Sequence, residues 1–121
     1  METVEETIHF LETLKKSVVL EVLVAALLAD RKRLAAAPVR FAGFWVSLSD
    51  RLTERAERDL RSVRMELRRL GVEILETVQS EEAREVRCRW KGTIRKEKWL
   101  NEWLKAECVK QLEAYAGFDR A

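Results

Sequence analysis

The sequence predicts a mostly helical α+β fold: two long helices, one two-stranded antiparallel β-hairpin and a C-terminal helix. Apolar residues recur every three or four positions over two long segments, which is the period of a helix. Near residue 72 the period shortens to two, as in a strand. The length of 121 residues is ordinary for one domain, and four glycines and one proline are too few for a loop-rich β-sandwich. We therefore expect residues 1–121 to form a single domain.

The first helix is expected over about residues 3–36. Thr3 and Glu6 have the spacing of a capping box, and Pro38 cannot be accommodated in a helix interior. From Val18 onward the segment is apolar on nearly every side, so we expect this half to be buried all round. A helix of this length spans about 50 Å, whereas a compact domain of this size is roughly 35 Å across. The helix must bend, or protrude and be covered by another chain, which makes a homodimer our hypothesis.

An aromatic connection is expected over about residues 37–48. Solvated linkers are polar, but this one carries Phe41, Phe44 and Trp45. The connection either folds down as a lid over the core or presents an aromatic patch to a partner protein. The second alternative makes these three side chains candidates for a protein-interaction surface.

The second helix is expected over about residues 49–70. Ser47 and Asp50 have capping-box spacing, Ser49 is a competing N-cap, and Gly71 suits the position just past the end. Seven arginines and several acidic residues occupy most of the other positions. A narrow apolar stripe with such a charged remainder is typical of a helix that pairs within the chain or across a dimer. The stripe consists of Leu48, Leu52, Ala56, Leu60, Val63, Leu67 and Leu70.

The β-hairpin is expected over about residues 72–91. Residues 86–91 alternate strictly between apolar and basic side chains, which is the inside–outside pattern of a strand. An earlier run of alternating residues precedes the polar stretch 79–83, which we expect to be the hairpin loop. A lone hairpin is marginal in water, so its apolar face must pack on a helix or on a second copy. Three tryptophans are expected to pack together between the hairpin and the last helix: Trp90, Trp99 and Trp103.

The last helix is expected over about residues 95–117. Its apolar stripe runs from Leu100 to Tyr115 at helical spacing. Gly117 suits the position just past the helix, and Phe118 is placed for the hydrophobic contact that often accompanies such a cap.

The sequence favours a cytoplasmic protein without a membrane span. Cys88 and Cys108 are too few and too scattered for a disulfide framework or a zinc site, so we expect both to be buried in a reducing compartment. The N-terminus is acidic where a signal peptide would be basic. The apolar run Val18–Ala29 covers only about 18 Å of a hydrocarbon core of about 30 Å, and it contains Glu21.

The polar composition argues against an enzyme. His9 is the only histidine, and the chain has neither a glycine-rich phosphate loop nor a serine at a strand–turn–helix elbow. Glu6 and His9 have the spacing of half a di-iron carboxylate site, but the full site needs a second such pair. We therefore expect no catalytic residue, no metal and no cofactor.

Basic residues follow one another through the second half of the hairpin and beyond it. In element order, a basic hairpin after an arginine-rich helix resembles the wing and preceding helix of winged-helix proteins. That resemblance implies phosphate contacts by Arg and Lys and a helix that reads the major groove. The other reading is an edge strand protected by outward-facing charges. The candidate nucleic-acid-binding residues are Arg84, Arg87, Arg89, Lys91, Arg95, Lys96 and Lys98.

The leading hypothesis is a small non-catalytic protein that self-associates, as a homodimer, and serves as a binding or accessory module for an unidentified protein partner. Its candidate residues are Phe41, Phe44, Trp45 and Glu21. Glu21 is included because an acid inside an apolar run needs a cationic partner, from the second helix or from a second chain. The alternative is a DNA- or RNA-binding protein.

Overall fold

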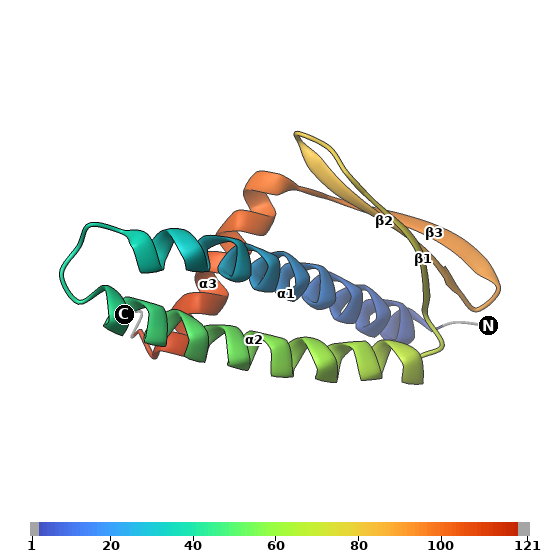
Figure 1. The fold of residues 1–121 in the computed structure, drawn as a ribbon. Helices are drawn as coiled ribbons and strands as arrows, with labels where there is room; N and C mark the ends of the chain where they lie inside the picture. Colours follow the sequence, from blue (N-terminus) through green and yellow to red (C-terminus); the bar gives the residue numbers. More distant parts are fainter. Residues whose placement is uncertain (1–2, 119–121) are drawn as a thin grey trace.

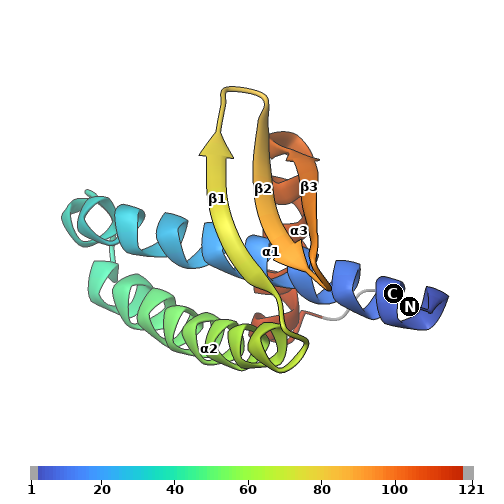
Figure 2. The same cartoon turned by 90° about the vertical axis from the view of Figure 1, so that its right-hand side faces the viewer.

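The computed structural model describes residues 3–118, which form three helices and one three-stranded antiparallel sheet (Figure 1). The helices α1 and α2 lie side by side as an antiparallel hairpin. The sheet, in the order β1-β2-β3, covers one part of α1, and α3 crosses the helical hairpin (Figures 1 and 2). The elements are α1 (Val4–Ala36), α2 (Ala42–Arg69), β1 (Glu73–Gln79), β2 (Ala83–Trp90), β3 (Thr93–Leu100) and α3 (Asn101–Ala116).

The helical α+β class is confirmed, and so is the first helix. Thr3 caps α1, since its side chain accepts a hydrogen bond from the Glu6 backbone N–H at 3.1 Å. Burial along α1 differs from the expectation. Its buried side chains lie between Phe10 and Leu23, whereas most residues from Ala25 onward are exposed. The sheet stops short of that end of the helix, and the alanines there favour helix without needing burial (Figure 1).

The prediction of an aromatic connection over residues 37–48 is wrong, because α2 already begins at Ala42. The N-cap is Phe41, in the left-handed conformation with φ 61° and ψ 32°, and its carbonyl accepts from the Phe44 N–H at 2.9 Å. Phe44 and Trp45 therefore lie on the first turns of α2, and Phe41 and Phe44 are exposed rather than folded down as a lid. Without a side-chain oxygen at the cap, nothing in the sequence pattern marks this start.

The rest of α2 follows the expected stripe. Ala56, Leu60, Val63 and Leu67 are buried. At the end of the helix Gly71 has a φ of +80°, and the Val72 N–H donates to the Leu67 carbonyl at 2.9 Å, which is the hydrogen bond of a Schellman cap.

The sheet has a third strand where the last helix was expected to begin. A two-residue turn joins β2 to β3, with φ values of +51° at Lys91 and +74° at Gly92, as in a type I′ hairpin. β3 pairs with β2 along its whole length, so α3 begins at Asn101 rather than near residue 95. The prediction of a helix from residue 95 was wrong because Arg95 and Glu97 lie on the inner side of β3. Charged residues at these inner positions remove the alternation of apolar and polar residues that usually indicates a strand.

The core joins the sheet to the helical hairpin through one stacked pair. The Trp90 ring lies 4.3 Å from the Phe10 ring at an interplanar angle of 10°, and its indole N–H donates to the Leu70 carbonyl at 3.1 Å. Trp99 packs against this core, whereas Trp103 lies at its margin. Both cysteines are free and buried, as expected.

We expect Trp90→Ala to lower the free energy of unfolding by about 3–5 kcal/mol, since Trp90 is only 2% exposed and its removal leaves a cavity. Trp103→Ala is the matched control. Its side chain is 36% exposed, so its loss should cost less than about 2 kcal/mol. Urea denaturation followed by circular dichroism measures both, and equal losses would contradict the central place given to Trp90.

Candidate protein-interaction surface

An apolar groove of about 510 Å³ lies where α1, α2 and α3 meet, at the end of the helical hairpin that the sheet leaves uncovered. We call it the end groove. Each helix contributes residues spaced three or four positions apart, so one face of each helix forms one wall. Asp30 and Glu113 are the charged residues among those that line it. The apolar lining comes mainly from Leu27, Leu34, Trp45, Leu48, Leu52, Val109, Leu112 and Phe118.

The wall formed by α3 is fixed to α2 by Tyr115 and Arg55. The Arg55 guanidinium lies 4.7 Å from the centre of the Tyr115 ring and donates to the Tyr115 carbonyl at 2.6 Å. The Tyr115 hydroxyl donates to Asp59, and burial together with this hydrogen bond raises the pKa of Tyr115 above its ordinary value. These contacts hold the last turn of α3 in place beside the groove.

The chain reverses after α3 and brings Phe118 to the groove. Gly117 has a φ of +75°, and the Phe118 N–H donates to the Glu113 carbonyl at 3.0 Å, which completes a Schellman cap. The sequence pattern predicted this cap. It did not reveal that Phe118 and Val109 would join Trp45, because that depends on how α3 crosses the other helices.

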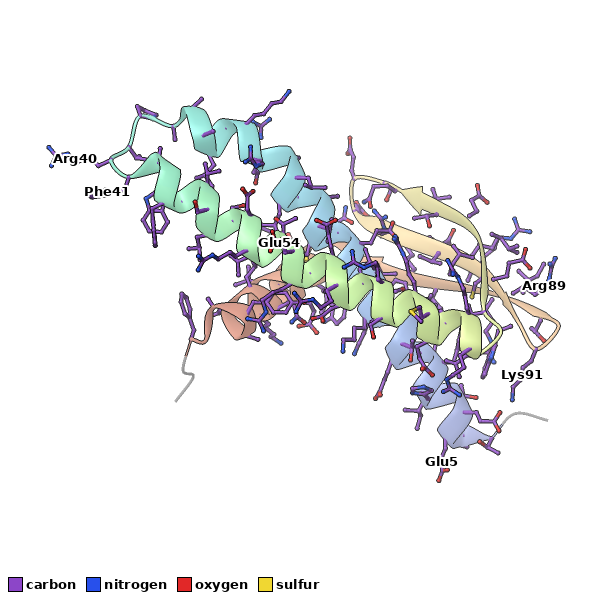
Figure 3. All side chains as sticks on the ribbon, turned by 60° about the horizontal axis from the view of Figure 1, so that its bottom comes forward. Glu5, Arg40, Phe41, Glu54, Arg89 and Lys91 are labelled. Atoms are coloured by element: carbon purple, nitrogen blue, oxygen red, sulfur yellow. The ribbon has the colours of Figure 1, made fainter. Side chains whose placement is uncertain are left out.

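Next to the groove, the connection between α1 and α2 projects from the molecule. We call Val39, Arg40, Phe41 and Phe44 the aromatic tip. Phe41 is 78% exposed and Phe44 is 60% exposed, and Arg40 and Phe41 point away from the rest of the chain (Figure 3). Phe44 makes an edge-on contact with Trp45, with ring centres 5.2 Å apart. Of the three aromatic side chains singled out from the sequence, Phe44 and Trp45 are thus in contact beside the groove, whereas Phe41 projects outward next to them.

Glu21, the fourth candidate, lies elsewhere. Its carboxylate lies 3.4 Å from the Arg64 guanidinium of α2 and also accepts a hydrogen bond from Arg84 of β2. Both partners belong to the same chain, and the Glu21 side chain is still 42% exposed. Glu21 therefore connects α1 to α2 and to the sheet, and it is not part of the end groove.

Residues 5–120 match the family model described as YhjD protein. The chain belongs to the YhjD family. Comparison with curated proteins and comparison with solved structures gave no match. The family match covers nearly the whole chain, so the end groove and the sheet both lie within the YhjD region.

The seven basic candidates of this YhjD chain are divided between two sides of the sheet, and four of them share the outer side, where Arg87 lies opposite Lys96. Arg84 points inward to Glu21. Arg95 also faces inward, with its guanidinium 5.3 Å from the centre of the Trp90 ring. Lys96 and Lys98 are exposed on the outer side of β3 and form no ion pair with any residue between 3 and 118.

The three other basic candidates are each paired with a glutamate. Arg87 lies 3.7 Å from Glu76, and Arg89 lies 3.2 Å from Glu73, on the adjacent strand. Lys91 pairs with Glu6 of α1. Arg89 and Lys91 lie at the end of the molecule opposite the aromatic tip (Figure 3).

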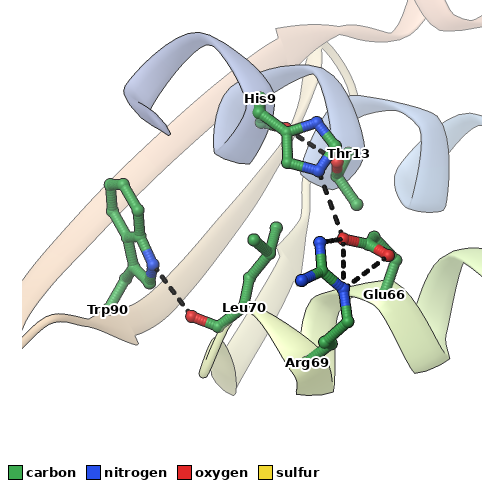
Figure 4. Close-up of polar contacts among 6 residues, drawn as sticks. All are labelled: His9, Thr13, Glu66, Arg69, Leu70 and Trp90. Atoms are coloured by element: carbon green, nitrogen blue, oxygen red, sulfur yellow. Dashed lines mark hydrogen bonds and ion pairs between the residues drawn. The ribbon is translucent and has the colours of Figure 1, made fainter. Parts of the chain in front are cut away.

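The single histidine belongs to an ion-pair cluster between α1 and α2 (Figure 4). His9 Nε2 lies 3.2 Å from a Glu66 carboxylate oxygen, and the Arg69 Nε–H donates to the same carboxylate at 3.0 Å. The hydrogen bonds from Arg69 and then His9 lower the pKa of Glu66 to about 2.

Within residues 3–118, no group of three or more His, Cys, Asp or Glu side chains is arranged to hold a metal ion. In the same range, no helix is both long and apolar enough to cross a membrane.

The acid stability of this YhjD chain should depend on Glu66. Its pKa in the folded protein, about 2, lies below the ordinary 4.5, so the ionised carboxylate stabilises the fold above about pH 4.5. This contribution is lost as the pH falls from about 4.5 to about 2. We expect Glu66→Gln to flatten that part of the plot of Tm against pH, measured by circular dichroism. Glu54→Gln, at an exposed position of α2, should keep the wild-type profile. Indistinguishable profiles for wild type and Glu66→Gln would contradict the assignment.

Proposed function

We propose that this protein is a small non-catalytic module that self-associates and acts through protein–protein contacts at the end of its helical hairpin. One observation carries the proposal: the aromatic tip and the end groove both expose apolar side chains, and the contact between Phe44 and Trp45 joins them. Large exposed apolar patches rimmed by polar residues mark interaction sites in monomeric proteins.

The size of the aromatic area supports this proposal. An aromatic side chain has roughly 150–250 Å² of surface, so the four at this end together expose roughly 500 Å². That value already falls within the range of the largest apolar patches of typical monomers, about 300–600 Å², before any aliphatic side chain is counted. The exposed fractions are 78% for Phe41, 60% for Phe44, 44% for Trp45 and 65% for Phe118.

Two further observations support a non-catalytic protein that works in the cytoplasm. The imidazole of His9 contacts Glu66 within an ion-pair cluster, and no nucleophilic side chain is bonded to either of its ring nitrogens within residues 3–118. Both cysteines are buried as free thiols, which suits a reducing compartment. Burial raises the pKa of Cys88 and Cys108, so neither is activated as a thiolate nucleophile.

We expect sedimentation velocity over about 1–100 μM protein to show a dimer that dissociates on dilution. The double variant Phe41→Ser/Phe44→Ser should be monomeric across this range. Its Tm should stay within about 2 °C of wild type, because both side chains are exposed. The matched control is Val78→Thr/Ile94→Thr, which removes exposed apolar groups from the outer side of the sheet and should leave the dimer intact. A wild-type monomer at about 100 μM, or a tip variant that dimerises as strongly as wild type, would refute the proposal.

The nucleic-acid alternative has its own test. Pairing of Arg87 and Arg89 with glutamates on β1 reduces the positive charge that phosphates would meet. We therefore expect labelled duplex and single-stranded oligonucleotides to show no binding by fluorescence anisotropy at about 50 mM salt. Micromolar binding that weakens at least about tenfold at about 200 mM salt, and that is lost in Arg87→Ala/Arg89→Ala, would favour the alternative instead.

A further inference from the structure

We infer that two copies join through a reciprocal two-fold contact, in which the aromatic tip of each copy fills the end groove of the other. This inference rests on the proposed self-association and adds what occupies the groove. The argument uses the size of the groove, the direction of the tip, the charges on both and the symmetry of a dimer.

The groove is large enough for the tip. Its volume of about 510 Å³ lies within the range of about 300–1,000 Å³ that holds a ligand of several rings, which exceeds one aromatic side chain. The tip offers two phenylalanine rings, from Phe41 and Phe44, three positions apart at the start of one helix. Trp45, in the lining, and Phe44, in the tip, are already in contact, so the apolar surface continues from one to the other.

The tip does not occupy the groove of its own chain. Neither Phe41 nor Phe44 belongs to the lining of the groove, and Phe41 projects away from it (Figure 3). The left-handed conformation of Phe41 and the helix that begins at Ala42 fix this outward direction. An aromatic occupant must therefore come from another molecule.

The charges favour a second copy of this chain. Arg40 belongs to the tip, and it forms no ion pair with any residue between 3 and 118. Asp30 and Glu113 both line the groove. Asp30 also lies 3.5 Å from Arg33 of its own helix, but this pair is exposed and weak, so a cation beside two aromatic rings would still meet carboxylates beside an apolar surface. Such charge complementarity fixes register and discourages other arrangements.

Two-fold symmetry allows both contacts to form at once. Tip and groove lie beside each other at one end of the molecule, so an axis passing close to Trp45 places each tip against the groove of the other copy. The contact closes at two copies, because each tip and each groove is then used. With Val39 and Val109 added, the roughly 500 Å² of exposed aromatic surface approaches the roughly 800 Å² that each partner buries in a stable complex.

Charge reversal tests the contact directly. Arg40→Glu and Asp30→Arg should each weaken the dimer about tenfold in sedimentation velocity, since each places like charges together in both contacts. An equimolar mixture of the two variants should return to within about threefold of wild type, because each tip then meets an opposite charge in the other chain. Lys96→Glu, an exposed cation on the sheet, is the control and should leave the dissociation constant unchanged.

A second measurement does not depend on the strength of an ion pair. Chains that carry Arg40→Cys, mixed with chains that carry Glu113→Cys, should form an intermolecular disulfide under mild oxidation, because the two native cysteines are buried. Arg40→Cys chains alone should stay uncross-linked, since the two tips face grooves and not each other.

The outcomes separate this inference from the proposed function. A wild-type monomer overturns both. A wild-type dimer whose charge-reversed variants bind normally, or are not restored by mixing, overturns only the reciprocal contact. Cross-linking of Arg40→Cys chains with themselves shows a tip-to-tip dimer and likewise overturns it.

Discussion

The architecture depends on a mismatch of lengths between its helices and its strands. A helix of 33 residues, as in α1, is about 50 Å long, whereas a strand of eight residues, as in β2, spans only about 26 Å. The sheet therefore covers only part of the helical hairpin, and α3 closes a further part from another side (Figure 1). What remains uncovered is the end that carries the aromatic tip and the end groove. The place of the proposed interaction surface follows from the lengths of the elements that leave it uncovered.

Charged residues divide the molecule into two regions of different chemistry. On the outer side of the sheet, Arg87 and Arg89 are matched by glutamates on the neighbouring strand, whereas Lys96 and Lys98 form no ion pair within residues 3–118. The reading of this segment as a protected edge strand is wrong, because β2 is the central strand and its charges lie on a face of the sheet. At the helical end, the lining of the groove is mostly aromatic and aliphatic, and Asp30 and Glu113 are its charged residues. We therefore place the proposed association at that end and not on the sheet.

The sequence predicts the ends of a helix where capping residues mark them. Thr3 caps α1 and Gly71 ends α2, as their residue types predict. The start of α2 has no such mark, because Phe41 takes a left-handed conformation without a capping side chain. β3 escapes detection for a different reason: Arg95 stacks over Trp90 and Phe10, so an inner position is filled by a cation–π contact instead of an apolar residue.

The candidate surface likewise has a part that the sequence indicates and a part that depends on how the helices pack. Phe41, Phe44 and Trp45 stand out because aromatic residues are unusual outside a helical stripe, and the structure brings two of them, Phe44 and Trp45, into contact. The α3 side of the groove depends on how that helix crosses the hairpin, and the crossing is set by contacts such as Tyr115 with Asp59 and Arg55. These contacts join residues more than fifty positions apart, and no periodicity within α3 reports them.

The buried core and the proposed association surface lie in different parts of this chain. The buried residues of α1 end at Leu23, and the Trp90–Phe10 stack lies at the opposite end of that helix from the tip. Replacing an exposed tip residue removes little buried surface, so its effect on folding is small while its effect on a contact between copies is large. The aromatic tip therefore adds nothing that the fold of one chain requires, and it leaves apolar surface in water at a cost in solubility. A contact with another chain would remove that cost, and this is the physical argument for the proposed interface at the uncovered end of the hairpin.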